Sequence, residues 1–383
     1  MLQSSGRKIT LGVPQSGYNV DRNILSSIPP SMKRVRPFDV HRVVSRARYA
    51  AKMSLPLRSL FGFAEPYFPR VDLFHFYNTV ANVHVPWVCT FEHELPFYGN
   101  RDPKLIRHGA GLLDRAVCRR LIAFSDSARL VASLKWRAEL DSRQAARLEA
   151  KVEVLLPPQA ISEERRSDLS DEVREFFFLG GDFYRKGGLE FLRAIDRIDR
   201  LALRRFHATV VGRLDSIGDF ASRASAADRD EAISILARHK DRIDHYDRLP
   251  SAEARHVMAR SRYHVLPTLQ DTFGYSVLEA MATGAVVITT NVSSLPEIVR
   301  PETGHMLEFR LDERRQVHNS PDFAEQREAL VERLADTIRR CLETPEPERV
   351  AMADAAKDLL RDHHDPARHA ARIAQIYEEA LSG

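Results

Sequence analysis

Short strand-like runs alternate along the first part of the chain with longer segments whose apolar residues recur at helical spacing. The strand-like runs cover residues 9–13, 33–36, 72–77, 87–91, 121–124 and 152–156. Strands separated by helix-length segments predict a parallel sheet with helices on both faces, because parallel neighbours need a long crossover connection. The pattern therefore predicts an α/β domain.

A second series of the same kind follows Pro157 and Pro158, which cannot continue a strand or occupy a helix interior. Its strand-like runs cover residues 175–179, 207–211, 243–246, 263–266, 286–290 and 305–309. We predict two doubly wound domains that face a central cleft, since ligands of such sheets bind beyond the carboxyl ends of the strands. The predicted units are residues 1–156, residues 157–365 and a final helix, 366–383, that packs back on the first domain.

The composition is that of an ordinary globular protein, with 383 residues of which 44% are hydrophobic and 29% charged. No stretch approaches the roughly 18 apolar residues that a membrane-spanning helix needs. The 3 cysteines stand far apart and match no metal-ligand spacing, which favours a reducing compartment. We expect a cytoplasmic location.

Positive charge is concentrated in the first domain. Residues 1–155 hold 24 Lys/Arg against 13 Asp/Glu, or +11, which leaves 33 against 40, or −7, for the remainder. Residues 31–70 alone carry nine basic side chains, interleaved with leucine and phenylalanine. This mixture suits an anionic membrane surface, with a solvated basic helix as the alternative of equal weight. Nucleic acid is not expected as a partner, because the chain has no zinc finger, RNP-type aromatic motif or basic tail.

The segment 266–290 contains the strongest local signal for chemistry. It reads as a strand, a loop, a short helix, a glycine stop and a strand. Asp271 and Thr272 are residues of the type that caps helices, and Gly274 lets a ligand approach the backbone. The amino end of the short helix, with its free N–H groups, is favourable for phosphate. On residue type alone, Glu279 is interpreted as part of a polar helix face.

A second glycine loop follows the first strand-like run of the second domain. It reads Leu-Gly-Gly-Asp-Phe-Tyr-Arg-Lys-Gly-Gly over residues 179–188 and precedes a helical segment. Gly180 and Gly181 open the loop, and Arg185 and Lys186 bring two positive charges to it. Such a loop can hold a diphosphate, with a solvated turn as the simpler alternative. It is not a P-loop, because no Gly-Lys-Ser/Thr follows.

In the first domain, an ionisable cluster ends the strand-like run 87–91. Glu92, His93 and Glu94 lie where a parallel sheet presents its carboxyl end, which is where substrates bind. A lone histidine is more often structural than functional, so His93 and Glu92 remain alternatives. The loop after the first strand contains one glycine, Gly17.

These segments together resemble family 4 glycosyltransferases. Residues 271–284, Asp-Thr-Phe-Gly-Tyr-Ser-Val-Leu-Glu-Ala-Met-Ala-Thr-Gly, are similar to the family's Glu-x7-Glu signature, with Asp271 in place of the first glutamate. Residues 291–299 continue the match. The loop that contains Lys186 is similar to the family's Gly-Arg…Arg-Lys-Gly stretch, with Gly181 in place of its first arginine. The resemblance implies the GT-B fold of two Rossmann-like domains and a retaining transfer from a nucleotide-diphosphate sugar.

The resemblance also assigns roles to residues. Lys186 would contact the leaving diphosphate, with Arg185 as the substitute for the missing arginine. Asp271 would bind the donor sugar, Glu279 would hold the ribose hydroxyls, and His93 would lie beside the transferred sugar. The further donor-binding positions are Phe273, Gly274, Tyr275, Gly180, Gly181 and Gly17.

No metal or cofactor is expected beside the donor substrate. The Asp-x-Asp formed by Asp228 and Asp230 lies in a polar helical stretch and is interpreted as surface charge. The segment 362–369, rich in aspartate and histidine, is interpreted as a solvated helix junction rather than a metal site, because it is polar throughout and interrupted by a proline.

We therefore predict a metal-independent glycosyltransferase with a saccharide or lipid-linked acceptor. Its expected context is bacterial cell-envelope or exopolysaccharide synthesis, in the cytoplasm and peripheral on the inner face of the membrane. The alternatives are a nucleotide-sugar epimerase on the same fold, a non-catalytic nucleotide-sugar-binding protein, and a basic peripheral-membrane adaptor.

Overall fold

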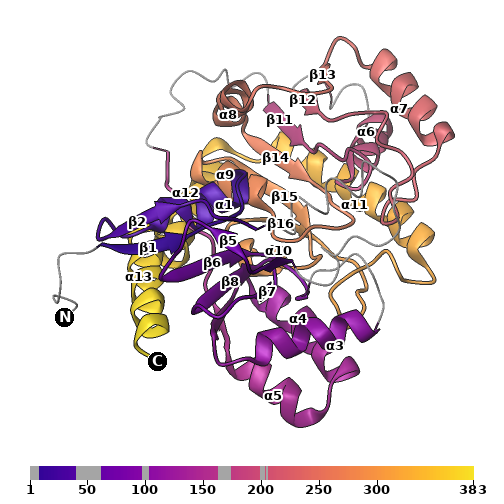
Figure 1. Ribbon diagram of the computed structural model, residues 1–383. Helices are drawn as coiled ribbons and strands as arrows, with labels where there is room; N and C mark the ends of the chain where they lie inside the picture. The colour runs from indigo at the N-terminus through magenta and orange to yellow at the C-terminus, as the bar shows by residue number, and fades with distance from the viewer. Residues whose placement is uncertain (1–7, 40–61, 97–102, 163–173, 199–202, 204–205) are drawn as a thin grey trace. The chain divides into compact units, whose positions relative to one another are not determined.

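The computed structural model describes residues 8–39, 62–96, 103–162, 174–198, 203 and 206–383. The chain divides into two compact units, the first made of Met1–Pro158 and His364–Gly383 and the second of Gln159–His363. Each unit contains a six-stranded sheet in which all neighbours run parallel, so the predicted α/β architecture is confirmed (Figure 1). The unit boundaries lie two residues from the predicted ones.

The first unit is built on a sheet of order β10-β9-β8-β6-β1-β2. Its strands are β1 (Ile9–Gly12), β2 (Met32–Val35), β6 (Leu73–Tyr77), β8 (Trp87–Phe91), β9 (Cys118–Ala123) and β10 (Val152–Val154). Its helices are α1 (Tyr18–Asn23), α3 (Pro103–Asp114), α4 (Asp126–Glu139), α5 (Ser142–Ala150) and α13 (Pro366–Ser382), with a 3-10 turn η1 (Leu25–Ser27). All six predicted strands are present, with ends that differ by a few residues.

Both faces of this sheet are buried, because successive residues of its strands are apolar and point to opposite sides. Trp87 and Cys89 of β8 belong to a core with α3, α4 and α5. Val88, between them, belongs to a second core that includes Ile373 and Ile376 of α13. A strand that is buried at every position, as β8 is, therefore has helices packed on both faces.

Helix α13 packs on the first unit, as predicted for the end of the chain. Its Tyr377 hydroxyl lies 2.7 Å from Nδ1 of the fully buried His75, and His369 Nδ1 lies 2.9 Å from Ser27 Oγ. His364, just before the helix, places Nδ1 2.7 Å from the carbonyl oxygen of Pro157. The expectation of a solvated junction at 362–369 is thus wrong for His364 and His369. Both are buried, because the segment packs on the first unit and its two histidines form hydrogen bonds there.

The second unit has a sheet of order β13-β12-β11-β14-β15-β16. Its strands are β11 (Arg174–Leu179), β12 (Phe206–Val211), β13 (Ile243–Tyr246), β14 (Tyr263–Leu266), β15 (Val286–Thr290) and β16 (Gly304–Leu307). Its helices are α6 (Gly188–Arg197), α7 (Ala226–Arg238), α8 (Ser251–Arg260), α9 (Tyr275–Ala282), α10 (Leu295–Ile298), α11 (Phe323–Glu343) and α12 (Glu346–His363). Three of its strands, β13, β14 and β15, begin and end at the predicted residues.

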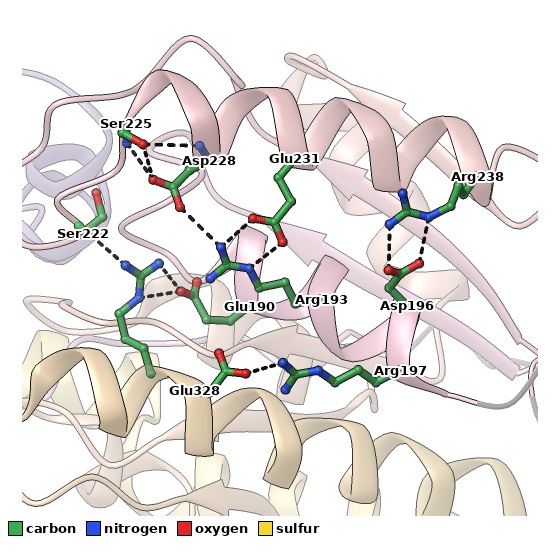
Figure 2. Close-up of polar contacts among 11 residues, drawn as sticks. Glu190, Arg193, Asp196, Arg197, Ser222, Ser225, Asp228, Glu231, Arg238 and Glu328 are labelled. Carbon is green, nitrogen blue, oxygen red and sulfur yellow. Dashed lines mark hydrogen bonds and ion pairs between the residues drawn. The ribbon is translucent and has the colours of Figure 1, made fainter.

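Ion pairs join α6 to the helices on either side of it (Figure 2). Arg193 of α6 donates to both carboxylate oxygens of Glu231 on α7, at 2.8 and 2.6 Å. The carboxylate of Glu190 is fully buried and pairs with Arg327 of α11. Asp228, expected to be plain surface charge, closes a capping box with Ser225 at the start of α7. These contacts hold the helix that follows the 179–188 loop.

The basic stretch of the first domain is described only in part. Lys33 and Arg34 are exposed on β2, the edge strand of the first sheet. Beside the sheet, β3 (Phe38–Asp39) and β5 (Tyr67–Phe68) form a two-stranded antiparallel ribbon, and β4 (Phe63–Ala64) pairs with β7 (Ala81–Asn82). Arg36, exposed after β2, donates to the carbonyl oxygen of Pro14 at 3.3 Å and to Ser16 Oγ at 2.9 Å. The basic residues from Arg42 to Arg58 lie outside the described residues, so the expectation for them stays a prediction.

Candidate active site

Two loops of the second unit meet at the carboxyl ends of neighbouring strands. β11 leads into residues 180–187, and β14 leads into residues 267–274. The N–H of Leu269 donates to the carbonyl oxygen of Arg185 at 3.0 Å, and Thr268 Oγ1 donates to the same oxygen at 3.2 Å. Because the two strands are parallel neighbours, the two sequence signals come together at one edge of the sheet.

Lys186 and Asp271 form an ion pair across these loops. Lys186 Nζ lies 2.7 Å from Asp271 Oδ2, and only 18% and 9% of the two side chains is exposed. Asp271 Oδ1 also accepts the N–H groups of Thr272 at 2.8 Å and Phe273 at 3.3 Å. Burial acts to raise the pKa of Asp271, but the charge and hydrogen bond of Lys186 and the Thr272 N–H outweigh it, so this pKa lies below its usual value. Asp271 is therefore ionised at neutral pH and accepts hydrogen bonds only.

A second cation, Arg185, lies beside the pair and is held by acids on both sides. It bonds to Asp182 within its own loop, and its Nε lies 3.8 Å from Oδ2 of Asp219 in the loop after β12. The hydrogen bond from Arg185 lowers the pKa of Asp182 below its ordinary range, against the opposing effect of burial. The edge of the sheet thus presents two cations whose carboxylate partners fix their directions.

The glycines of the two loops differ in the space around their Cα atoms and in their backbone conformation. A Cβ on Gly180 would lie 2.6 Å from Lys186 Cβ, so this glycine lets the lysine stem pack over the loop. Gly181 faces open space, with nothing within 4 Å of a Cβ built there. Gly274 has φ +95° and precedes α9 as its N-cap without a side-chain cap. The expectation that Asp271 and Thr272 cap this helix is wrong, because Gly274 is the N-cap residue. The carboxylate of Asp271 instead accepts hydrogen bonds from Lys186 and from the N–H groups of Thr272 and Phe273.

Helix α9 carries the remaining signature residues. The ring of Phe273 is fully buried, so only its backbone is available to a ligand. Tyr275 and Glu279 are half-buried, whereas Val277 and Leu278 belong to the core. The helix therefore presents Glu279 on its polar face, in agreement with its predicted position there.

The first unit contains a polar cluster at the carboxyl ends of β1, β6 and β8. Glu92 accepts hydrogen bonds from Asn19 Nδ2 at 3.3 Å and Asn78 Nδ2 at 3.1 Å, and its own N–H donates to Asn78 Oδ1 at 3.1 Å. His93 follows it, half-buried. Gly17, with φ +122°, precedes α1 as its N-cap. His93 and Gly17 thus belong to a different unit from Lys186 and Asp271.

Sequence reasoning missed Asp182, Asp219, Asn19 and Asn78, which fix the predicted residues. Their signal was position: Asp182, Asp219 and Asn78 lie in loops that follow a strand at the carboxyl edge of its sheet, and Asn19 lies in the first turn of α1, shortly after β1. Asp182 was inside the segment already singled out. For the others, the residue type alone is too common in loops to identify a site.

The described residues contain neither a candidate metal cluster nor a candidate membrane span. Within the described ranges, no three His, Cys, Asp or Glu side chains are placed to hold a metal ion. No helix in the described part of the chain is both long and apolar enough to span a bilayer. The three cysteines are buried and unpaired.

Comparison with protein families gives a match inside the second unit. Residues 174–344 match the family described as glycosyl transferases group 1. The sucrose synthase of Acidithiobacillus caldus is 28% identical over 248 residues, which are 57% of this chain and 29% of that protein. The chain therefore spans less than a third of the length of this curated relative.

Solved structures resemble the chain over nearly its whole length. A glycosyltransferase from Rickettsia africae has a TM-score of 0.64 at 13% identity and covers 98% of this chain and 99% of its own. Anabaena HepE in complex with UDP has a TM-score of 0.60 at 13% identity, with 97% and 99% covered, and HepE is also known in complex with UDP-glucose. WaaG, a glycosyltransferase involved in lipopolysaccharide biosynthesis, has a TM-score of 0.55 at 14% identity, with 94% and 98% covered. At identities this low, the structural likeness shows a shared fold alone.

Proposed function

Residues 174–344 form a glycosyltransferase domain in a chain with the GT-B fold, and from this premise we propose that the protein moves a sugar from a nucleotide-diphosphate sugar to an acceptor hydroxyl. The transfer retains the anomeric configuration and needs no metal ion. The acceptor is a saccharide or a lipid-linked saccharide. The observation that carries the proposal is the pairing of Lys186 with Asp271 where two neighbouring strands end.

The cations act on the leaving group. When the bond between the anomeric carbon and the phosphate oxygen breaks, its electron pair goes to the diphosphate, whose negative charge grows. Lys186 and Arg185 stabilise that charge, because fixed cations aimed at a developing anion lower the barrier without reorganisation. Gly181, which has open space beside it, lets the diphosphate approach the loop backbone.

The proton of the acceptor hydroxyl goes to the leaving phosphate oxygen on the same face of the sugar. The acceptor oxygen forms the new bond to the anomeric carbon there, so configuration is retained and no dedicated protein base is required. Asp271, ionised and accepting only, receives a hydrogen bond from a hydroxyl of the donor sugar. Glu279 holds the ribose hydroxyls. His93 and Glu92 are the candidates that contact the sugar from the first unit.

A nucleotide-diphosphate donor is supported by HepE, which shares the fold and is described with UDP and with UDP-glucose. The loops around Lys186 fit such a donor, since they offer two cations to a diphosphate and a carboxylate to a sugar. We propose a nucleotide-diphosphate hexose as the donor class.

We also propose that the first unit meets an anionic membrane surface on the cytoplasmic side, where a lipid-linked acceptor of cell-envelope or exopolysaccharide synthesis resides. Lys33 and Arg34 are exposed there, and Phe38 and Phe68 expose 52% and 57% of their surface with ring centroids 6.4 Å apart. Exposed aromatic rings beside cations are typical of surfaces that enter a lipid interface. WaaG, which shares the fold, is a glycosyltransferase involved in lipopolysaccharide biosynthesis, and this supports the envelope context. Sedimentation with phosphatidylglycerol vesicles tests the surface: we expect binding that weakens in Phe68→Ser and in high salt, and protein that stays in the supernatant refutes it.

The proposed transfer is tested by donor screening and one substitution. Thermal unfolding with a panel of nucleotide sugars, with magnesium and with a chelator, is expected to show one donor that stabilises the protein in both conditions. With that donor, Lys186→Ala is expected to lower turnover by about 10²–10³-fold, the scale for loss of one such stabilising group. Lys240→Ala, an exposed lysine of the same unit, is the control.

The outcomes separate the alternatives. Donor binding without transfer or hydrolysis identifies a non-catalytic nucleotide-sugar-binding protein, and isomerisation of the donor alone identifies an epimerase. Turnover by Lys186→Ala at the wild-type rate removes this lysine from the mechanism.

A further inference from the structure

The second unit contains a cavity of about 730 Å³ at the open edge of its sheet. It lies between β16 with the residues that follow it and one face of α11, and its lining includes Met306, Phe309, Arg333, Thr337 and Arg340. None of the candidate active-site residues lines it. Strands β14 and β15 separate β16 from the strand that leads to Lys186, so the cavity lies apart from the candidate donor site.

Two arginines of α11, Arg333 and Arg340, line the cavity, and each donates a hydrogen bond to a neutral acceptor. Arg333 Nη2 donates to the carbonyl oxygen of Glu308 at 2.9 Å, while its Nε is enclosed and, among the described residues, has no hydrogen-bond partner. Burial lowers the pKa of Arg333. Arg340 Nη2 donates to Thr337 Oγ1 at 3.0 Å. Within the described part of the chain, neither guanidinium has a carboxylate oxygen within 4.0 Å.

The acids of the same lining form no ion pair with these two arginines. Asp336 bonds to Arg339, Glu325 is exposed, and Glu308, also exposed, acts on Arg333 only through its charge, which opposes the effect of burial on the arginine's pKa. A half-buried guanidinium such as that of Arg333 is stabilised by a bidentate anionic partner, which it lacks among the described residues.

The strand edge adds backbone donors. The carbonyl oxygen of Leu307 accepts the N–H of Asn291, so Leu307 faces β15. Because residues of a strand alternate, the backbone groups of Met306 and Glu308 face the open edge, in agreement with the bond from Arg333 to the Glu308 carbonyl. The N–H groups of a free sheet edge are hydrogen-bond donors of the kind that anions accept.

We propose that this cavity is a second ligand site, which binds a phosphorylated or carboxylated small molecule through Arg333, Arg340 and the edge of β16. Seven residues separate the two arginines, about 10.5 Å along the helix axis, and place them on the same face. The site therefore suits a compact ligand with more than one anionic oxygen group. It is independent of the proposed transferase activity.

Calorimetric titration with pyrophosphate and with citrate tests the site, in a chain that carries Lys186→Gln to remove a cation of the candidate donor site. We expect one binding event in that chain. Adding Arg333→Gln or Arg340→Gln is expected to weaken it by about tenfold or more, since a charge-assisted hydrogen bond is lost. Arg255→Gln, which replaces an exposed arginine of α8 that does not line the cavity, is the control and is expected to change nothing.

The comparison of pyrophosphate with citrate also identifies the class of anion. The use of two arginine variants keeps the test valid if one of them fails to fold. Preference for pyrophosphate over citrate assigns a phosphorylated ligand, and the reverse assigns a carboxylated one. Arg340 is exposed, so its variant remains informative if Arg333→Gln unfolds. Equal affinity in the Arg340→Gln and Arg255→Gln chains, or no heat from either anion once Lys186 is replaced, overturns the proposal.

Discussion

Replacing Arg327 by methionine is expected to destabilise the second unit strongly, because it leaves a carboxylate buried without its cation. Glu190 has no exposed surface, and Arg327 donates to its Oε1 through both Nε, at 2.7 Å, and Nη2. Its other carboxylate oxygen, Oε2, is buried with no partner among the described residues. Arg327 Nη1 also donates to the carbonyl oxygen of Ser222 at 3.1 Å. Removing one partner of a buried ion pair costs about 3–5 kcal/mol of unfolding free energy.

The same helix pair supplies the control. Arg197 of α6 pairs with Glu328 and Glu332 of α11, whose side chains are 59% and 61% exposed. Figure 2 shows the pair with Glu328. Exposed ion pairs contribute about 0–1 kcal/mol, so Arg197→Met is expected to cost little. The double variant Glu190→Leu with Arg327→Met replaces the pair by apolar side chains and is expected to regain most of the loss.

Urea unfolding measures these differences for the two units separately. The chain's two tryptophans, Trp87 and Trp136, both belong to the first unit, so their fluorescence follows that unit while far-ultraviolet circular dichroism follows both. We expect Arg327→Met to shift the circular dichroism transition. A loss below about 1 kcal/mol, or a double variant no more stable than Arg327→Met, would refute the reasoning that burial makes this pair costly to break.

Two further perturbations follow from the structure. Burial lowers the pKa of His75 to about 3 and that of His369 to about 4, so both are neutral when folded, and the unfolded chain takes up their protons below about pH 6.5. The first unit is therefore expected to lose about 2 kcal/mol per histidine between pH 7 and pH 5, and urea unfolding of His369→Gln with the same pH dependence as the wild type would contradict this. Gly187→Ala is expected to destabilise the loop of Lys186, because φ is +79° and the new Cβ would lie 2.0 Å from the carbonyl oxygen of Pro267; an unchanged thermal midpoint would show that the loop relaxes freely.

Most of the fold was predictable because its strands are buried on both faces. Strands such as β8, Trp87–Phe91, and β15, Val286–Thr290, are buried throughout and apolar apart from threonines, which sets them apart from the helices around them, where polar faces recur. The ends were less predictable: β9 begins at Cys118, earlier than expected, since Cys118 pairs with Trp87 and Arg120 with Val88, and Arg119 is the extra residue at a register shift between these two pairs. Backbone pairing with β8 outweighed side-chain polarity there.

The histidines near the end of the chain show what local sequence cannot reveal. His364 and His369 lie in a polar segment, and nothing in that segment indicates burial. They are buried because Pro157 and Ser27, both more than 200 residues away in sequence, supply their hydrogen-bond partners. Such partners depend on the return of α13 to the first sheet, which is a property of the tertiary fold.

The candidate site was predictable in its residues and not in their pairing. Lys186 and Asp271 each follow a strand, and their segments carry glycine and charge in patterns that local sequence displays. That they meet depends on β11 and β14 being neighbours in the sheet, which the order β12-β11-β14 decides. Asp219 was missed because its role comes from the loop after β12, which reaches Arg185 only in the folded unit.

The ion pair with Lys186 explains how aspartate, which is shorter than the glutamate of the family signature, can serve at position 271. Asp271 bonds to the N–H groups of the next two residues, a local turn that a short carboxylate makes readily, and it still reaches Lys186 at 2.7 Å. These bonds fix the carboxylate to its own loop. If the ion pair opens, we therefore expect the long side chain of Lys186 to move and the carboxylate to stay in place. Under the proposed function, a diphosphate that draws Lys186 away would free Oδ2 to accept a sugar hydroxyl at the same moment. Aspartate in place of glutamate is then expected to couple the phosphate and sugar contacts of the proposed donor site through Lys186.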